Sequence, residues 1–149
     1  MRKIEIFDST LRDGAQGGGI AFSVEDKLAA ARVLDQLGVQ YIEAGNPGSN
    51  PKDQEFFKRA QALALTHARL SAFGSTRRKG LRPQEDGNLQ SLLGAGTPCC
   101  TLFGKAWKFH VDWVLETTPE ENFAMIEESC RFLKSQGKEV IFDAEHFFD

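Results

Sequence analysis

Short apolar stretches rich in branched and aromatic residues alternate with longer amphipathic stretches along the whole chain. Each short stretch is typical of a buried strand, and each amphipathic stretch predicts a helix with one apolar face. The predicted strands begin near Ile4, Val39, Leu70, Cys99 and Val140, about 30 to 40 residues apart, which is the length of a strand–helix–strand unit. The pattern therefore predicts an α/β fold built on a parallel sheet.

The amphipathic stretches carry recognisable signals for helix ends. Ser23–Asp26 predicts a capping box at the start of the first helix, and Gly38 predicts its end. Asn50-Pro51 and Thr118–Glu121 each place a capping residue before a proline at the first helical position. A weaker helix is predicted around 88–93. The predicted buried stripes are Val24, Leu28, Ala31 and Leu34; Phe56, Phe57, Ala60 and Leu63; and Phe123, Ile126, Cys130 and Leu133.

Charged and polar residues follow each predicted strand. The carboxyl ends of parallel strands lie along one edge of their sheet, where ligands bind in α/β folds, so these residues are expected to converge on one face. They are Arg12 and Asp13 after the first strand, Glu43 at the end of the second, Ser75 to Arg78 after the third, Lys105 and His110 after the fourth, and Asp143, Glu145 and His146 at the fifth.

The run from residue 4 to 19 carries the densest chemistry. Asp8, Arg12 and Asp13 place two carboxylates and a guanidinium within six residues, and glycines follow them. A carboxylate is a hard ligand for a divalent cation, and an arginine offers a fork of donors to a carboxylate or an alkoxide. For any one of these residues alone, a solvated turn is the commoner role.

The segment Asp-Ser-Thr-Leu-Arg-Asp-Gly-Ala-Gln at 8–16 resembles the opening motif of the metal-dependent lyase-like barrels. This group contains 2-isopropylmalate, homocitrate and citramalate synthases and hydroxymethylglutaryl-CoA lyase, and the chain is most similar to the citramalate synthase branch. The resemblance extends over the whole chain. Its further segments are RDGAQGGGIAFSVEDK (12–27), YIEAGNPGSNPKD (41–53), FGSTRRKG (73–80), TLFGKAWKFHV (101–111) and IFDAEHFFD (141–149).

The resemblance implies the N-terminal part of a (β/α)8 barrel, with about four βα units and a fifth strand. Residues 1–149 would then be a partial catalytic barrel domain, truncated before the later strands. The His-x-His metal ligands of the family come from a later strand that this sequence does not reach. The chain on its own is therefore expected to be inactive.

The implied reaction is an acyl transfer in which acetyl-CoA condenses with a 2-oxo acid. Pyruvate as the acceptor would give (R)-citramalate, a step of isoleucine biosynthesis. The alternatives are 2-isopropylmalate synthase (leucine biosynthesis), homocitrate synthase, an aldolase-like lyase of the same superfamily, or a catalytically inactive barrel fragment. The implied cofactor is a divalent metal, magnesium or manganese with zinc as a further candidate, and acetyl-CoA is the co-substrate.

Each candidate residue has an ordinary structural role beside the implied functional one. Asp13 is the implied metal ligand, although a lone aspartate more often caps a turn. Arg12 is implied to be catalytic and to bind the 2-oxo acid, and its ordinary role is a surface ion pair. Glu43 ends an apolar strand, where structural and catalytic roles are equally plausible from the residues alone, and the resemblance implies the catalytic role. Glu145 is the implied catalytic group for proton transfer.

Two more residues are candidates for substrate binding. Gln16 lies in the glycine-rich part of the opening motif. Arg77 begins a basic run that could hold a carboxylate or phosphate, although a solvated loop is at least as common. His146 is a weaker candidate, because a histidine among aromatic residues is often simply packed. His67 is expected on the surface.

Composition narrows the class of protein further. The chain has 149 residues, 41% of them hydrophobic and 26% charged, with a net charge of -3. These values are typical of a globular domain and give no indication of a nucleic-acid or membrane partner. Three cysteines, two of them adjacent, suit packing rather than disulfides. The cysteines therefore indicate a cytoplasmic protein. The resemblance implies that it acts on small molecules, and a homodimer is expected.

Overall fold

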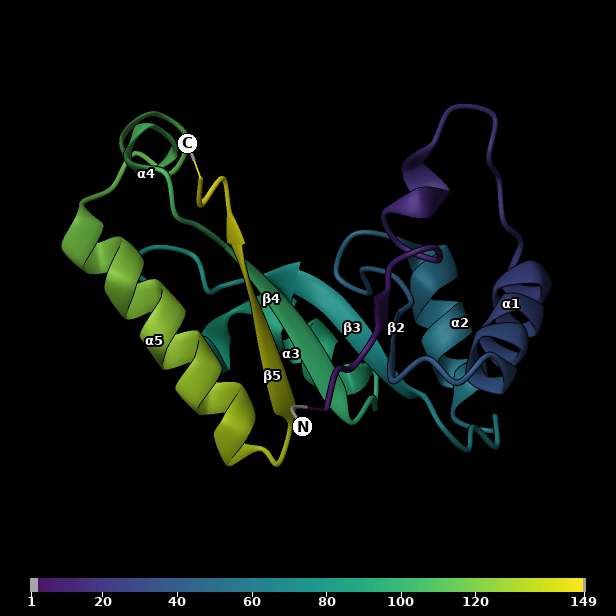
Figure 1. Ribbon diagram of the computed structural model, residues 1–149. Helices are drawn as coiled ribbons and strands as arrows, with labels where there is room; N and C mark the ends of the chain where they lie inside the picture. Colours follow the sequence, from purple (N-terminus) through teal and green to yellow (C-terminus); the bar gives the residue numbers. More distant parts are fainter. Residues whose placement is uncertain (1–2, 149) are drawn as a thin grey trace.

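The computed structural model describes residues 3–148. Five strands form one parallel sheet in chain order, as the spacing of the apolar stretches predicts. Figure 1 shows that the sheet is curled, with β1 and β5 at its two edges. This is the curvature of a partial α/β barrel. The strands are β1 (Phe7–Asp8), β2 (Tyr41–Glu43), β3 (Arg69–Ser75), β4 (Cys99–Lys105) and β5 (Glu139–Glu145).

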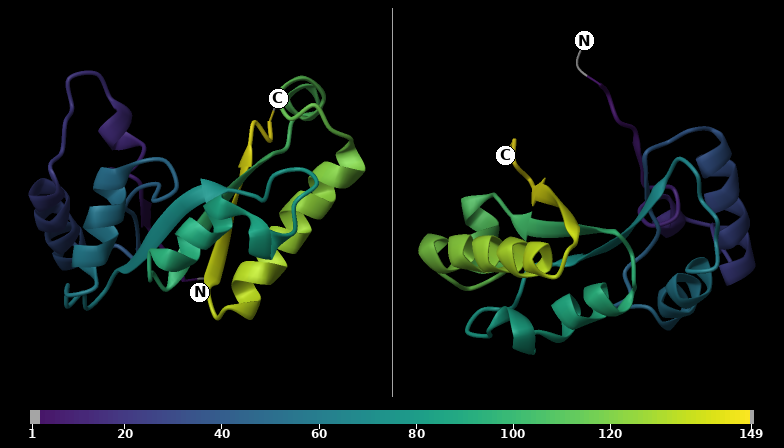
Figure 2. Two further views of the ribbon diagram at one scale, coloured as in Figure 1. Left: turned by 180° about the vertical axis from the view of Figure 1, so that it is seen from behind. Right: turned by 90° about the horizontal axis from the view of Figure 1, so that it is seen from below.

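The helices lie around the outside of the curled sheet (Figure 2, right), which leaves the inner face open. They are α1 (Val24–Gln36), α2 (Pro51–Ala60), α3 (Gly87–Gly94), α4 (Lys108–Trp113) and α5 (Pro119–Ser135), with 3-10 turns η1 (Gly14–Gln16) and η2 (Pro83–Glu85). The short helix α4 was not predicted. It contains His110, for which we predicted a position in the loop after the fourth strand. No helix within residues 3–148 is long and apolar enough to cross a membrane.

The predicted helix starts are confirmed. The Ser23 hydroxyl accepts a hydrogen bond from Asp26 N (3.1 Å), and the Asp26 carboxylate accepts one from Ser23 N (2.9 Å), which completes the capping box. Asn50 caps α2 through Lys52 N (2.9 Å). Thr118 caps α5 through the backbone nitrogen of Glu121. Such caps satisfy donors that the helix itself cannot pair.

The buried face of α5 matches the predicted stripe at Leu133 and differs from it at Phe123. Phe123 is exposed, whereas the buried residues of α5 are Asn122, Met125, Ser129 and Leu133. The hydroxyl of Ser129 accepts a hydrogen bond from Arg77 N (2.8 Å). Because these polar side chains find partners in the interior, they can occupy the buried face, and a hydrophobic pattern cannot anticipate this.

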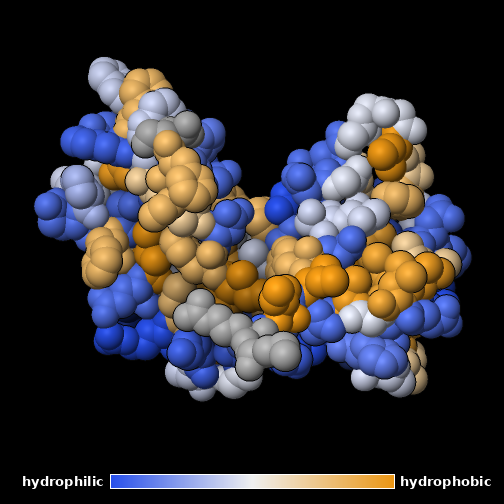
Figure 3. Space-filling model, in the orientation of Figure 1, coloured by the Kyte–Doolittle hydropathy of each residue, from blue (hydrophilic) through white to orange (hydrophobic). Residues whose placement is uncertain are grey.

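The inner face of the sheet carries polar and aromatic side chains, and the outer face carries the core under the helices. Cys100 belongs to this outer core, whereas its neighbour Cys99 points the other way, as alternation along a strand requires. On the inner face Ser71 and Thr101 share a hydrogen bond (2.8 Å). Figure 3 shows apolar side chains across the middle of the face that is seen in this view.

All five strands run in one direction, so their carboxyl ends lie along the same edge of the sheet. Glu43, Ser75, Lys105 and Glu145 are the last residues of β2 to β5. The first strand pairs with β2 only through Phe7 and Asp8, a shorter strand than its apolar run from Ile4 predicts. The segment carrying Arg12 and Asp13 follows β1 directly, so it reaches the same edge.

Candidate active site

Arg12 connects two carboxylates at the carboxyl edge of the sheet. Arg12 Nε donates a hydrogen bond to Glu43 Oε2 (2.6 Å), and Arg12 Nη1 donates one to Asp13 Oδ1 (3.0 Å). The Arg12 side chain is largely buried, whereas that of Asp13 is 65% exposed. The structure therefore brings together the three residues that the sequence selected at the ends of the first two strands.

An aromatic surface supports this group. The guanidinium carbon of Arg12 lies 3.8 Å from the centre of the Phe73 ring, a cation–π contact. Phe73 in turn stacks on Phe103 of the next strand, with ring centres 5.0 Å apart. The sequence analysis did not select Phe73, because a phenylalanine in a strand carries no signal beyond packing. Its position fixes the plane of the Arg12 fork.

Glu43 is buried with only part of its hydrogen-bonding capacity used. Its side chain is 1% exposed, and Glu43 Oε1 has no hydrogen-bond partner among residues 3–148. Burial raises the pKa of Glu43, and the neighbouring charges of Asp143 and Asp13 raise it further. The Arg12 guanidinium opposes them without reversing the direction. An unpaired buried carboxylate oxygen is costly, which marks the position as a candidate ligand site.

Gln16 lines the same cavity as Arg12. Both residues line a cavity of about 180 Å³ between η1 and the loop that follows β2. This predicted pair of substrate-binding residues is thus brought to one place.

A buried ion pair holds the loop that follows Glu43. Lys27 Nζ contacts Asp53 Oδ1 (2.5 Å) and donates a hydrogen bond to the carbonyl oxygen of Ala44 (2.8 Å), while Asp53 Oδ2 accepts one from Asn46 N (2.9 Å). A Cβ atom at Gly45 would lie 2.4 Å from the Asp53 side chain, so only glycine fits there. Sequence reasoning missed Lys27 and Asp53, since both lie within helical patterns.

Glu145 lies at the other end of the same edge and pairs with Lys105, not with Arg12. The loops after β4 and β5 also carry an aromatic group, in which His146 packs against Trp107 and His110. His67 is exposed, as predicted.

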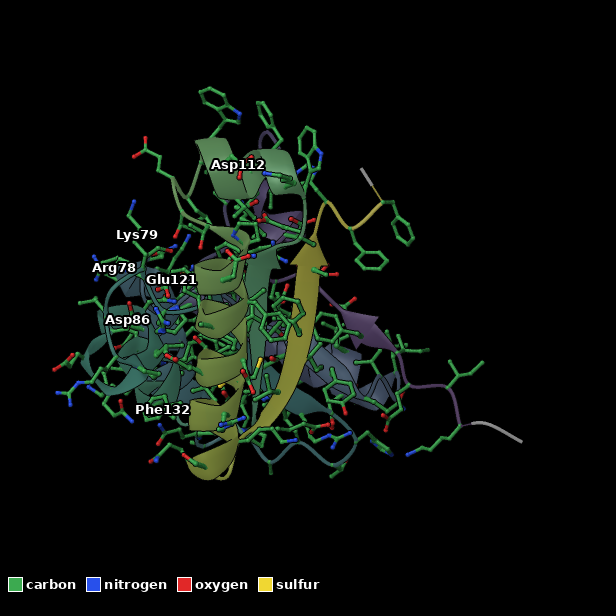
Figure 4. All side chains as sticks on the ribbon, turned by 90° about the vertical axis from the view of Figure 1, so that its left-hand side faces the viewer. Arg78, Lys79, Asp86, Asp112, Glu121 and Phe132 are labelled. Atoms are coloured by element: carbon green, nitrogen blue, oxygen red, sulfur yellow. The ribbon has the colours of Figure 1, made fainter. Side chains whose placement is uncertain are left out.

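Arg77 lies against α5, apart from Arg12. Its guanidinium donates hydrogen bonds to Glu121 (2.7 Å) and Glu128 (2.8 Å), and its side chain is 4% exposed. Figure 4 shows Arg78 and Lys79 of the same loop beside Glu121, with Asp112 above them on α4. These contacts use the fork of Arg77 to fix the loop after β3 to α5. Its predicted role in substrate binding stays a prediction.

The donors around Arg12 suit a hard divalent cation. Asp13 and Glu43 supply carboxylate oxygens, the ligands that magnesium and manganese prefer. Within residues 3–148 no three histidine, cysteine or acidic side chains form a complete metal site. The described residues therefore fit part of a coordination shell.

The chain forms a parallel half-barrel with helices on its outer face, and an arginine and two carboxylates lie at the carboxyl ends of its strands. This arrangement is typical of α/β barrel proteins, whose catalytic groups lie at that end of the barrel. The family model described as HMGL-like matches residues 3–149. The chain belongs to the HMGL-like family.

The chain is similar to several curated relatives named (R)-citramalate synthase. The relative from Aquifex aeolicus is 52% identical over 147 residues, and that from Geobacter sulfurreducens is 49% identical over 149. These matches cover 99% and 100% of this chain and 28% of each relative. A 2-isopropylmalate synthase from Shouchella clausii is 37% identical over 145 residues, 97% of this chain and 27% of that relative.

Solved structures show the same fold at lower identity. HMG-CoA lyase from Bacillus subtilis superposes with a TM-score of 0.69 at 17% identity, over 94% of this chain and 45% of that one. The enzyme from Pseudomonas aeruginosa gives 0.69 at 18% identity with the same coverage. These likenesses establish the half-barrel architecture, which confirms the fold class expected from the sequence.

Proposed function

We propose that this chain is part of an acyltransferase. It supplies the active-site residues that follow the first strands of the barrel. The reaction is the Claisen-type condensation of acetyl-CoA with pyruvate to give (R)-citramalate, in isoleucine biosynthesis. The observation that carries the proposal is Arg12 held between Asp13 and a buried, incompletely paired Glu43. Relatives of about 50% identity that are named (R)-citramalate synthase support pyruvate as the acceptor.

Arg12 stabilises the negative charge that develops on the carbonyl oxygen of the 2-oxo acid. Its guanidinium is fixed by Glu43 and Phe73, so its remaining donors need little reorganisation during the reaction. Gln16, in the same cavity, binds the carboxylate of the 2-oxo acid through its amide. Glu43 orients Arg12. Because Glu43 is buried, its pKa responds strongly to charges placed nearby.

Asp13 would hold a divalent cation through its exposed carboxylate. When bound, such an ion supplies Lewis-acid polarisation of the 2-oxo acid. Magnesium or manganese fits the oxygen donors better than zinc, which favours nitrogen and sulfur ligands. Glu145 accepts a proton from the thioester methyl group. A cytoplasmic homodimer stays a prediction.

A hybrid protein tests the proposal. In this hybrid the chain replaces the matching segment of the Aquifex aeolicus relative, and release of CoA from acetyl-CoA is measured with pyruvate, 2-oxoisovalerate or 2-oxoglutarate. We expect release that depends on pyruvate. Preference for 2-oxoisovalerate would instead support a 2-isopropylmalate synthase, which the 37% identical relatives represent.

The unmodified relative is the control for the assay, and circular dichroism with size-exclusion chromatography checks folding. A folded hybrid that releases no CoA with any of the three acids would contradict the proposal and favour the inactive alternative.

A further inference from the structure

Lys105 and Glu145 are the last residues of β4 and β5, and the strand register places them directly opposite one another. Lys105 Nζ and Glu145 Oε2 form an ion pair. Ala106 N also donates a hydrogen bond to the carbonyl oxygen of Glu145 (3.1 Å). The end of β5 is thus fixed to β4 through the main chain and through the side chains.

The surroundings of Lys105 restrict its ammonium group. The side chain is 18% exposed, and Nζ lies 5.7 Å from the centre of the Phe103 ring. On α5 the Asn122 amide donates a hydrogen bond to the carbonyl oxygen of Lys105 (2.9 Å). Lys105 also lines a cavity of about 400 Å³ between the loops after β3 and β4. This lysine therefore has far less freedom than one on an open surface.

We infer that Lys105 is a positioning residue that orients the Glu145 carboxylate for proton transfer. The inference rests on the proposed condensation. In that step a C–H bond of the thioester methyl breaks, and the proton moves to Glu145. The electron pair forms the new bond to the carbonyl carbon of the 2-oxo acid, whose oxygen takes up the negative charge.

A proton acceptor works only within hydrogen-bond reach of the proton that it removes. A free glutamate side chain samples several rotamers, and holding one of them reduces the entropy lost in reaching the transition state. Lys105 provides that restraint from the neighbouring strand β4. Arg12 and Asp13 follow β1, at the opposite side of the sheet from β5. Separate residues therefore orient the two functional groups: Glu43 orients Arg12, which stabilises the oxyanion, and Lys105 orients Glu145, which accepts the proton.

Lys108 provides a matched control. It also pairs with an acidic residue, Asp112, but four positions away on α4, and its side chain is 73% exposed. An exposed helical pair of this kind has little effect on stability or geometry. Lys105 and Lys108 lie three positions apart and carry the same charge. A difference in turnover between their variants therefore comes from the location of Lys105 beside Glu145, and not from the loss of a positive charge alone.

The test compares Lys105→Met, Lys105→Arg and Lys108→Met in the hybrid. For Lys105→Met we expect kcat to fall roughly 10- to 100-fold, less than the roughly 100- to 10,000-fold of a whole acid–base contribution because Glu145 itself remains, and KM for pyruvate to stay within about twofold. Lys105→Arg should recover much of the loss, because a guanidinium also binds a carboxylate. Lys108→Met should change neither constant.

Lys105→Gln is a second variant, which keeps a polar group and loses the charge, and it should show the same fall in kcat. Wild-type turnover in a folded Lys105→Met or Lys105→Gln variant would overturn the role of Lys105 and leave the condensation standing. A rise in KM for pyruvate without a fall in kcat would also overturn it. A folded, unmodified hybrid without pyruvate-dependent CoA release would overturn the proposed function itself, a result that does not involve Lys105.

Discussion

Two polar clusters occupy opposite ends of the inner face, and they differ in how completely they are paired. At the amino end Arg69 donates hydrogen bonds to Glu139 (2.8 Å), to Glu5 (3.3 Å) and to the Tyr41 hydroxyl (2.7 Å). Tyr41 donates in turn to Glu139 (2.6 Å), which raises the pKa of Tyr41 to about 12. Arginine, tyrosine and carboxylates thus satisfy one another.

At the carboxyl end an arginine and two carboxylates form a network that is incomplete. Arg12 serves both Glu43 and Asp13, yet Glu43 Oε1 has no partner within the part of the chain that the structure describes. Closed networks rigidify a fold, whereas a buried group left unpaired is expected where a ligand completes it. We therefore propose that the carboxyl end of the sheet carries the chemistry and that the amino end is structural.

The largest expected effect comes from removing the outermost carboxylate of the incomplete cluster. Asp13→Ala in the hybrid should abolish CoA release and weaken magnesium or manganese binding, because it removes an oxygen ligand. Arg12→Lys should spare metal binding but lower turnover, since lysine cannot reproduce the planar fork. Steady-state kinetics and metal titration measure both effects.

Near-normal turnover in both variants would place the chemistry elsewhere in the protein. The matched control is Arg69→Lys in the closed cluster, which should change stability and leave turnover close to that of the hybrid.

A second prediction concerns Asp35, a fully paired carboxylate on α1. Its oxygens accept hydrogen bonds from the backbone nitrogens of Thr66, His67 and Ala68 and from the Thr66 hydroxyl. These donors stabilise the ionised form and hold the pKa of Asp35 well below its usual range. Asp35→Asn should lower the free energy of unfolding by about 1 to 3 kcal/mol at pH 7.

The same contacts make stability depend on pH. The stabilisation from Asp35 is fully present above its unfolded pKa of about 4 and is lost as the pH falls below it. Urea unfolding of this chain between pH 3 and 7 should therefore show a steeper loss in the parent than in Asp35→Asn. Parallel curves would contradict the assignment.

The smallest effects compare one carboxylate from each cluster. Because folding raises the pKa of Glu43, its ionised form destabilises the chain increasingly as the pH rises above the usual glutamate range. Glu43→Gln should therefore leave stability at pH 7 unchanged or raise it, by about 1 kcal/mol at most. Glu139→Gln should lower it by up to about 1 kcal/mol, because it weakens a closed network. Thermal unfolding at pH 7 distinguishes the two signs.

Much of the fold follows from the sequence, because α1, α2 and α5 begin at local capping signals and the strands recur at the spacing of a strand–helix–strand unit. The convergence of Arg12, Asp13 and Glu43 also follows, since the topology alone brings strand ends together. The orientation of Arg77 does not follow, because it depends on Glu121 and Glu128 from a helix over 40 residues away. Exposed Phe123 could not be predicted for a similar reason: buried polar residues displace it from the inner face of α5.

The pairing of the strands is uneven across the sheet. β4 and β5 pair over seven positions, β3 and β4 over five, β2 and β3 over three, and β1 and β2 over two. Amide hydrogen exchange should follow this gradient, with slow exchange in β4 and fast exchange around β1. The segment that carries Arg12 and Asp13 follows the strand with the fewest paired positions, so we expect its local opening to cost less than global unfolding. Loop and tertiary contacts, above all the fully buried side chain of Leu11 in the core, must then supply the order that the main-chain ladder does not.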